Sequence, residues 1–242
     1  MIKFFRKIRQ QLLTENKFSK YLLYAIGEII LVVIGILIAL QINNRNEELN
    51  QKETLNNIYR IIAQDIKSDS VDTATALKFI EDRKKLFNMI FSDSLTIDYV
   101  AQNQDINSIL TDLRVINIEK RGYNLLQDFD YQSNQEKDSL SFQIINFYTN
   151  SIFYTQKIED LILQDLVKTN DLWKQKDWYS SIIQNSPHKG YLDYILNDQE
   201  FKNLCAFRYT LYYDNYAPTL KQFQDGSERI LKAIDEQLID NN

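Results

Sequence analysis

The first change in the hydrophobic pattern lies near residue 20. Residues 21–42 are almost continuously hydrophobic, and Glu28 is the one charged residue among them. As a helix these 22 residues would cover about 33 Å, enough to cross a hydrocarbon core of about 30 Å. A cleaved signal peptide would have a shorter apolar stretch and a small-x-small cleavage site. The pattern therefore predicts a transmembrane helix over 21–42.

Residues 1–20 follow a different pattern, with apolar residues at helical spacing and basic residues between them. The apolar positions are Ile2, Phe5, Ile8 and Leu12, and the basic ones that would contact a membrane surface are Lys3, Arg6, Lys7 and Arg9. This pattern predicts an amphipathic helix on anionic headgroups. The alternative is a solvated basic tail.

Beyond residue 42, apolar residues recur near helical spacing, and helix breakers are rare. The chain has 5 Gly and 2 Pro, and neither occurs from 36 to 120. The spacing predicts a helix from the span to Phe91 with a break at 68–70, and a turn or helix cap at 92–94. Further helices are expected over 99–113, 118–126 (interrupted at Gly122), 139–176 and 198–238 (bent near Pro218). The expected loops are 130–138 and 180–190.

These elements predict an all-α fold, in which residues 43–242 form an antiparallel bundle of long helices. The expected core positions of the helix over 139–176 are its apolar residues. They are Phe142, Ile145, Tyr148, Ile152, Ile158, Leu161, Ile162, Leu166 and Leu172.

The N-terminal stretches MIKFFRKIRQ and KYLLYAIGEIILVVIGILIALQINN closely resemble the opening of a large family of bacterial membrane proteins. Its members have one span and share a domain of unknown function. A weaker similarity covers Gly122 to Leu126 and Ser139 to Tyr148. Family members usually have Trp after the Asn-Asn pair, where this chain has Arg45. The resemblance implies a membrane location and a helical body, and it implies no reaction.

Glu28 shares one face of the predicted span with small residues. At 100° per residue, Gly27, Glu28, Gly35 and Ala39 fall within a sector of 120°. Small residues four apart let two helices approach closely, and an acidic residue in a span generally faces another helix or a water path. We expect this stripe to pack against another helix, in a homo-oligomer or a larger complex. A proton relay through Glu28, or a tolerated lipid-facing Glu28, are the alternatives.

The charge distribution predicts the orientation of the span. Six Lys and Arg residues precede the span, whereas the residues after it open with mixed charge and are acidic overall. By the positive-inside rule, the N-terminus is cytoplasmic, and the body lies in the periplasm of a bacterial cell with an inner membrane. The acidic body also argues against nucleic acid as a partner.

Few residues offer chemistry. The single histidine, His188, lies in an expected loop, and the single cysteine, Cys205, permits no intramolecular disulfide. Phosphate-binding glycine loops and closely spaced His and Cys ligands are absent from the sequence. We therefore predict no catalytic residue, no metal ligand and no cofactor.

The stretch RYTLYYDNY, residues 208–216, is the most unusual of the body. Tyr209, Tyr212, Tyr213 and Tyr216 have the spacing of one helical face, and Arg208 precedes them. Such a face suits a partner or ligand surface. The alternative is a bundle core with hydroxyls at its rim.

Together these features predict a non-catalytic accessory or scaffolding subunit of an envelope complex, anchored in the lipid bilayer. A sensor-like module that binds a ligand between its helices and signals through a membrane partner is the second reading. An envelope enzyme is the third.

Overall fold

The computed structural model describes residues 18–103, 105–132, 139–184 and 189–240. It is all-α, with no strand among these residues, so the predicted fold class is confirmed. The chain divides into two compact units, Met1–Leu55 and Asn56–Asn242. The tail residues Lys3, Arg6, Lys7 and Arg9 lie outside the described residues.

Helix α2 runs without interruption from Phe18 to Phe91. The break expected at 68–70 is wrong, because Asp69 does not cap its own helix. Both of its carboxylate oxygens instead accept the Glu119 N–H at 3.2 Å, and Thr73 Oγ1 donates to the Asp69 carbonyl. The expected turn at 92–94 is confirmed. Asp93 has a φ of 53°, and the N–H groups of Ser94 and Asp93 cap the carbonyls of Met89 and Ile90.

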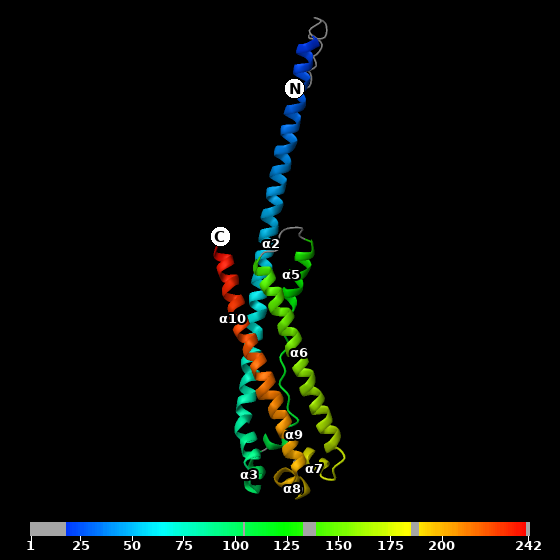
Figure 1. Ribbon diagram of the computed structural model, residues 1–242, viewed down its shortest axis with the longest axis vertical. Helices are drawn as coiled ribbons and strands as arrows, with labels where there is room; N and C mark the ends of the chain where they lie inside the picture. The colour runs from blue at the N-terminus through cyan, green and yellow to red at the C-terminus, as the bar shows by residue number, and fades with distance from the viewer. Residues whose placement is uncertain (1–17, 104, 133–138, 185–188, 241–242) are drawn as a thin grey trace. The chain divides into compact units, whose positions relative to one another are not determined.

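The second unit is a bundle that residues 56–91 of α2 form together with other long helices. These are α5 (Arg121–Gln132), α6 (Ser139–Trp173) and the line of α9 (Gln199–Tyr209), η1 (Thr210–Tyr216) and α10 (Ala217–Asp240). In Figure 1, α6 runs opposite to α5 and to α10, and it packs against α5, α9, η1 and α10. Residues 130–132 belong to α5 and not to the expected loop, and 133–138 are not described.

The buried side chains of α2 recur every seven residues, the repeat of helices packed nearly along one another. One series is Tyr59, Ile66, Thr73, Ile80 and Phe87, and all five are 2% exposed or less. On α6 the repeat is Ser141, Tyr148, Thr155, Ile162 and Thr169, and all five are buried. The core face expected for α6 is therefore partly wrong. Phe142 and Leu161 are exposed, because small hydroxyl residues occupy positions that a search for apolar residues passes over.

Short helices replace two of the expected elements. In place of the helix expected over 99–113, the described residues form the short helices α3 (Ile97–Gln102, capped by Thr96) and α4 (Asp105–Ser108). The expected connection over 180–190 contains α7 (Tyr179–Ile183) and the start of α8 (Lys189–Asn197). These pieces lie near an aromatic cluster in which Trp173 Nε1 donates to Tyr194 Oη at 3.2 Å. The other members of the cluster are Trp178, Tyr191 and Phe201.

Residues 112–120 form an extended segment outside any helix or strand (Figure 1), and acidic side chains accept two of its backbone N–H groups. Ile116 N–H donates to Glu159 Oε1 at 2.8 Å, and Glu119 N–H donates to Asp69. Directly afterwards, Gly122 N–H donates to Asp65 Oδ2 at 2.8 Å, so α2 supplies the N-terminal cap of α5. The helix predicted over 118–126 therefore begins later, at Arg121, and Gly122 lies in its first turn without interrupting it.

Candidate functional site

The predicted packing stripe of Gly27, Glu28, Gly35 and Ala39 lies in the first unit, on α2. Gly27, Gly35 and Ala39 are exposed and Glu28 is half-exposed within the chain. A Cβ added at Gly27 or Gly35 would meet no described atom within 4 Å. The fold of the described chain therefore gives no internal reason for glycine at these two positions, and a neighbouring helix would have room to approach there.

Most of the tyrosine segment, Thr210–Tyr216, forms the π-helix η1 between α9 and α10, and Arg208 and Tyr209 are the last residues of α9. Ala217 N–H donates to the Tyr212 carbonyl five residues earlier, and Asn215 Nδ2 donates to the Thr210 carbonyl at 2.9 Å. The following Pro218 has no N–H group for an α-helical bond. Where a bend was expected near Pro218, the helix changes from π-helix to α-helix between Tyr216 and Ala217. The wider turns also separate the tyrosines into two sets, which face different neighbours.

One set is interior, which corrects the expectation of an open surface. Arg208, Tyr212 and Tyr216 are fully buried. Arg208 Nε donates to Asp165 Oδ2 at 2.8 Å, and Nη2 lies 2.7 Å from the same oxygen in an ion pair, so the charge of Arg208 is already paired and is not presented to a ligand. Tyr212 Oη donates to the Asp112 carbonyl at 3.1 Å, and burial raises the pKa of Tyr212.

Tyr216 holds the extended segment in place together with Glu159. Its hydroxyl donates to Glu159 Oε1 at 2.5 Å, and the Ile116 N–H lies 3.2 Å from Tyr216 Oη. Burial is the main cause of a raised pKa for Glu159, and the hydrogen bonds from Tyr216 and Ile116 oppose it. These contacts hold the backbone of Ile116 in place and engage the Tyr216 hydroxyl and Glu159 Oε1 within the protein.

The other set, Tyr209 and Tyr213, faces α2. Tyr213 Oη donates to the Ile80 carbonyl at 2.7 Å, and both rings pack edge-on against Phe87. The two rings line a shallow groove of about 680 Å³ between α2 and the start of α10. Its charged residues include both signs, which gives no preference for an anion or a cation. They are Lys78, Glu81, Asp82, Lys84, Asp214 and Lys221.

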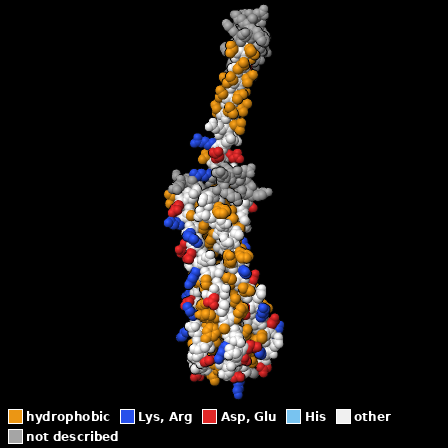
Figure 2. Space-filling view, viewed as in Figure 1, with side chains coloured by type: hydrophobic (Ala, Val, Ile, Leu, Met, Phe, Trp, Pro, Cys, Tyr) orange, Lys and Arg blue, Asp and Glu red, His pale blue; other side chains and the backbone are white. Residues whose placement is uncertain are grey.

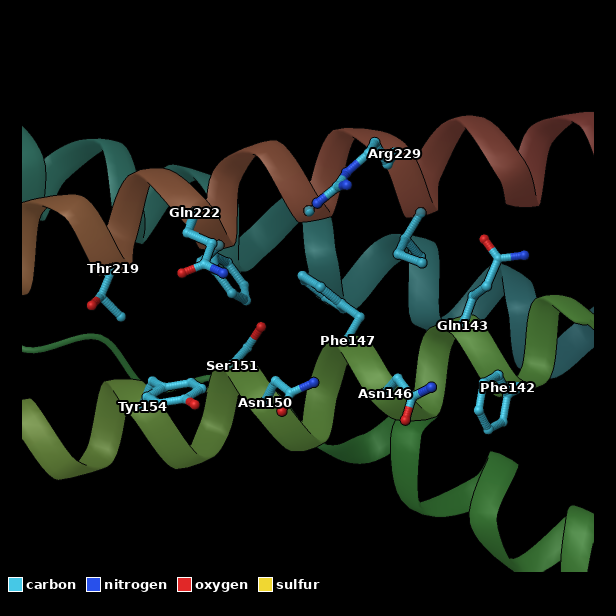
Figure 3. A pocket seen from close by; sticks show the side chains of 13 residues that line it. Phe142, Gln143, Asn146, Phe147, Asn150, Ser151, Tyr154, Thr219, Gln222 and Arg229 are labelled. Atoms are coloured by element: carbon cyan, nitrogen blue, oxygen red, sulfur yellow. The ribbon is translucent and has the colours of Figure 1, made fainter.

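A second groove, of about 350 Å³, lies between α6 and α10 (Figure 3). Phe147 and Ser151 point from α6 toward α10, while Thr219 and Gln222 point from α10 toward α6. The Phe147 ring stacks on Phe223 with centroids 5.4 Å apart. It reaches this position because α10 has Gly226, where a Cβ would lie 2.6 Å from Phe147 Cε2.

Little in the sequence predicts this groove. The helical spacing of its lining is ordinary, and the polar residues on both helices resemble any solvated surface. A usable signal was Gly226, a glycine within a helix whose periodicity continues on both sides.

Groups suited to covalent chemistry are sparse among the described residues. No set of three His, Cys, Asp or Glu could hold a metal ion there. Cys205 is buried, and burial raises the pKa of its thiol, which disfavours the reactive thiolate. His188 lies outside the described residues. The features that remain as candidate sites in the described part of the chain are therefore surfaces and grooves suited to binding.

Comparisons of the chain with protein-family models, with curated proteins and with solved structures found no match. The functional argument therefore depends on the chain's own residues.

Proposed function

We propose that this protein is a membrane-anchored helical protein that acts by binding, as an accessory or scaffolding subunit of a bacterial envelope complex. In this proposal residues 21–42 cross the inner membrane, the N-terminus is cytoplasmic, and the bundle is periplasmic. The Glu28–Gly35–Ala39 stripe contacts a helix of a membrane partner or of a second copy.

The observation that carries the proposal is the exposed hydrophobic surface at the beginning of α2. This is the described helix that is long and apolar enough to cross a membrane. Leu23 and Leu31 are 71% and 73% exposed, and Figure 2 shows hydrophobic side chains covering this part of the helix. Such a surface is unfavourable in water and suited to lipid. The bundle itself has charged side chains of both signs on its surface.

The test is a crosslinking capture of the tagged full-length protein from native membranes, with Glu28→Leu and Gly35→Leu beside it. We expect a defined membrane partner, or a second copy, to be captured with the wild type and lost with both variants. Ile30→Leu is the matched control, because Ile30 lies 200° around the helix from Glu28. Equal capture by all four proteins would refute the role of the stripe, and no capture by any would refute the subunit proposal.

One observation favours the sensor-like alternative. Helix α2 contains the hydrophobic segment and also one wall of the bundle, without a break from Phe18 to Phe91. A ligand held by bundle helices would then act on the helix that contains the span. A ligand-dependent change in crosslinking between spans would support this alternative over a constitutive scaffold.

A further inference from the structure

We propose that the groove between α6 and α10 binds an acidic glycan, a short chain of N-acetylated amino sugars that has one carboxylate. The proposed envelope location would supply such a ligand. The inference concerns the bundle alone and requires no partner of the span.

The charge of the groove is the first reason. The chain contains 33 Asp and Glu residues, yet none of the residues lining this groove is acidic, and Arg229 is its one charged side chain. Arg229 Nε donates to the Asp225 carbonyl at 3.3 Å, and no ion pair engages its guanidinium among the described residues. A mainly neutral ligand with a single anionic group matches this lining.

The second reason is a set of amide side chains without partners. Asn146, Asn150 and Gln222 are exposed at the groove, and their amides form no hydrogen bond with any residue that the structure describes. Each amide can both donate and accept. Sugar hydroxyls and acetamido groups also do both, so they can satisfy these amides in several ring orientations.

Aromatic rings supply the apolar part of the site. Phe147 stacks on Phe223, and Tyr154, which is 52% exposed, lies one turn from Asn150 on α6. The C–H faces of a pyranose ring can pack on such rings while its hydroxyls reach the amides. A sugar has apolar faces and polar edges, and the rings and amides of this groove are complementary to them.

A peptide fits less well. One common way of recognising an extended peptide is to add it to an open strand edge, and α6 and α10 offer no such edge because their backbone groups are used within their helices. A docked helix is about 10 Å or more across, and a groove of about 350 Å³ is of small-ligand size.

The test measures binding to the full-length protein in lipid nanodiscs by calorimetry and saturation-transfer NMR. Detergents with sugar headgroups are avoided because they would compete. The main probe is the disaccharide of N-acetylglucosamine and N-acetylmuramic acid. The others are di-N-acetylchitobiose, which lacks the carboxylate, cellobiose, which also lacks the acetamido groups, and an unsubstituted tetrapeptide.

We expect the acidic disaccharide to bind most tightly and cellobiose most weakly. Asn146→Ala together with Asn150→Ala should raise the Kd of the acidic disaccharide at least tenfold. Arg229→Gln should abolish the preference over chitobiose. Gln164→Ala, an exposed amide on α6 outside the groove, should leave the Kd unchanged.

The proposal is overturned if the wild type shows no saturable binding of the disaccharides, or if the groove variants bind them as the wild type does. Saturable tetrapeptide binding that the double variant weakens, without disaccharide binding, would assign the groove to peptides and also overturn it. Because the changed residues are exposed, circular dichroism should show all variants folded. The outcome is independent of capture through the span, so failure here and failure of the subunit proposal are separate results.

Discussion

At Gly122 the backbone of α5 lies directly against the backbone of α2. A Cβ at this position would lie 2.6 Å from Ile62 Cγ1 and 2.8 Å from Ile62 N. Asp65 fixes the same point, because it accepts the Gly122 N–H and pairs with Arg121 at 2.8 Å. Glycine is therefore required here by the approach of two helices, and its φ is not positive.

We expect Gly122→Ala to lower the free energy of unfolding by about 1–3 kcal/mol, because neither backbone can move away without breaking the Asp65 cap. Chemical unfolding of the full-length protein, followed by circular dichroism, measures it. Gly226→Ala is the comparison, since the atom it meets belongs to the half-exposed Phe147 ring, which can turn away. If Gly122→Ala lowered the free energy of unfolding less than Gly226→Ala does, the result would contradict this account.

Asp69 is an acidic residue in a core position of α2. It is 2% exposed, and burial raises its pKa from 3.8 to about 7, with Glu119, Asp65 and Asp72 adding to the shift. The Glu119 N–H opposes the shift. Between these two pKa values the folded state binds the proton more tightly than the unfolded state does. The stabilisation is therefore complete below about pH 4 and is lost as the pH rises through about 7.

Accordingly, the contribution of Asp69 should make the protein more stable at pH 5 than at pH 8, by on the order of 2–4 kcal/mol. Asp69→Asn should remove most of this difference, and the remainder should come from Glu159, whose pKa is also raised. Unfolding curves at a series of pH values test this. Asp72→Asn, an exposed acid on the same helix, is the control, and an equal loss of pH dependence there would count against the assignment.

The buried pair of Arg208 and Asp165 gives a third test. Arg208→Leu leaves the Asp165 carboxylate buried without its partner, so we expect a loss of about 3–5 kcal/mol. Leucine at both positions should recover most of it. Removing the exposed pair partner with Lys174→Ala should cost less than about 1 kcal/mol. A double variant no more stable than Arg208→Leu would show that the pair is not coupled.

The tyrosine spacing was visible in the sequence, but the role of these residues was not. Tyr212 and Tyr216 bond to Asp112 and Glu159, and the neighbouring Arg208 pairs with Asp165; these partners lie 43 to 100 residues away. Local spacing contains no information on such pairs. The same holds for Asp65 and Asp69, which look like exposed helical acids until α5 is placed beside them.

At the scale of elements, α6 contributes a core face that is rich in hydroxyl groups. Tyr59 and Ser141 share a hydrogen bond of 2.9 Å, whereas Thr155 Oγ1 and Thr169 Oγ1 are buried without a partner among the described residues. Thr155 borders a cavity of about 80 Å³, large enough for water, and Thr169 borders no such cavity among those described. An unsatisfied buried hydroxyl is destabilising, and a same-shaped apolar group removes the cost.

Thr169→Val should therefore raise the free energy of unfolding by about 0.5–1.5 kcal/mol, and Thr155→Val should raise it less. Thermal unfolding of the full-length protein provides the measurement. The exposed Thr75→Val serves as the control and should change stability by less than about 0.5 kcal/mol. Destabilisation by Thr169→Val would mean that its hydroxyl has a partner.

Long helices could be predicted because their hydrophobic period extends over many turns, as in α2 and α6. The short helices and the extended segment could not. Ile116 and Ile118 alternate with polar residues, but the bonds that hold this segment extended come from side chains of α2, α6 and η1. A pattern of a few residues does not distinguish such a segment from a helical turn.

At the scale of the molecule, the proposed orientation in the membrane determines the compartment in which the bundle would lie. The six Lys and Arg residues before the predicted span, against mixed charge directly after it, predict opposite sides for the two ends of the chain. Alkaline phosphatase fused to the C-terminus should therefore be active, because it requires the disulfide-forming periplasm. Green fluorescent protein at the same position should be dark. The reverse pattern would place the bundle in the cytoplasm.

The extended segment also has a consequence for the timing of folding. A chain is made from its N-terminus, and Tyr216 follows Ile116 by 100 residues. Residues 112–120 thus leave the ribosome long before α6 and η1 are synthesised and can pack against them. Until then, Ile116 and Ile118 are open to a chaperone or to a neighbouring nascent chain. The bundle can therefore be completed only after η1 has been synthesised. In a chain that ends before η1, the extended segment would lack the Tyr216 hydroxyl, and Ile116 and Ile118 would stay exposed.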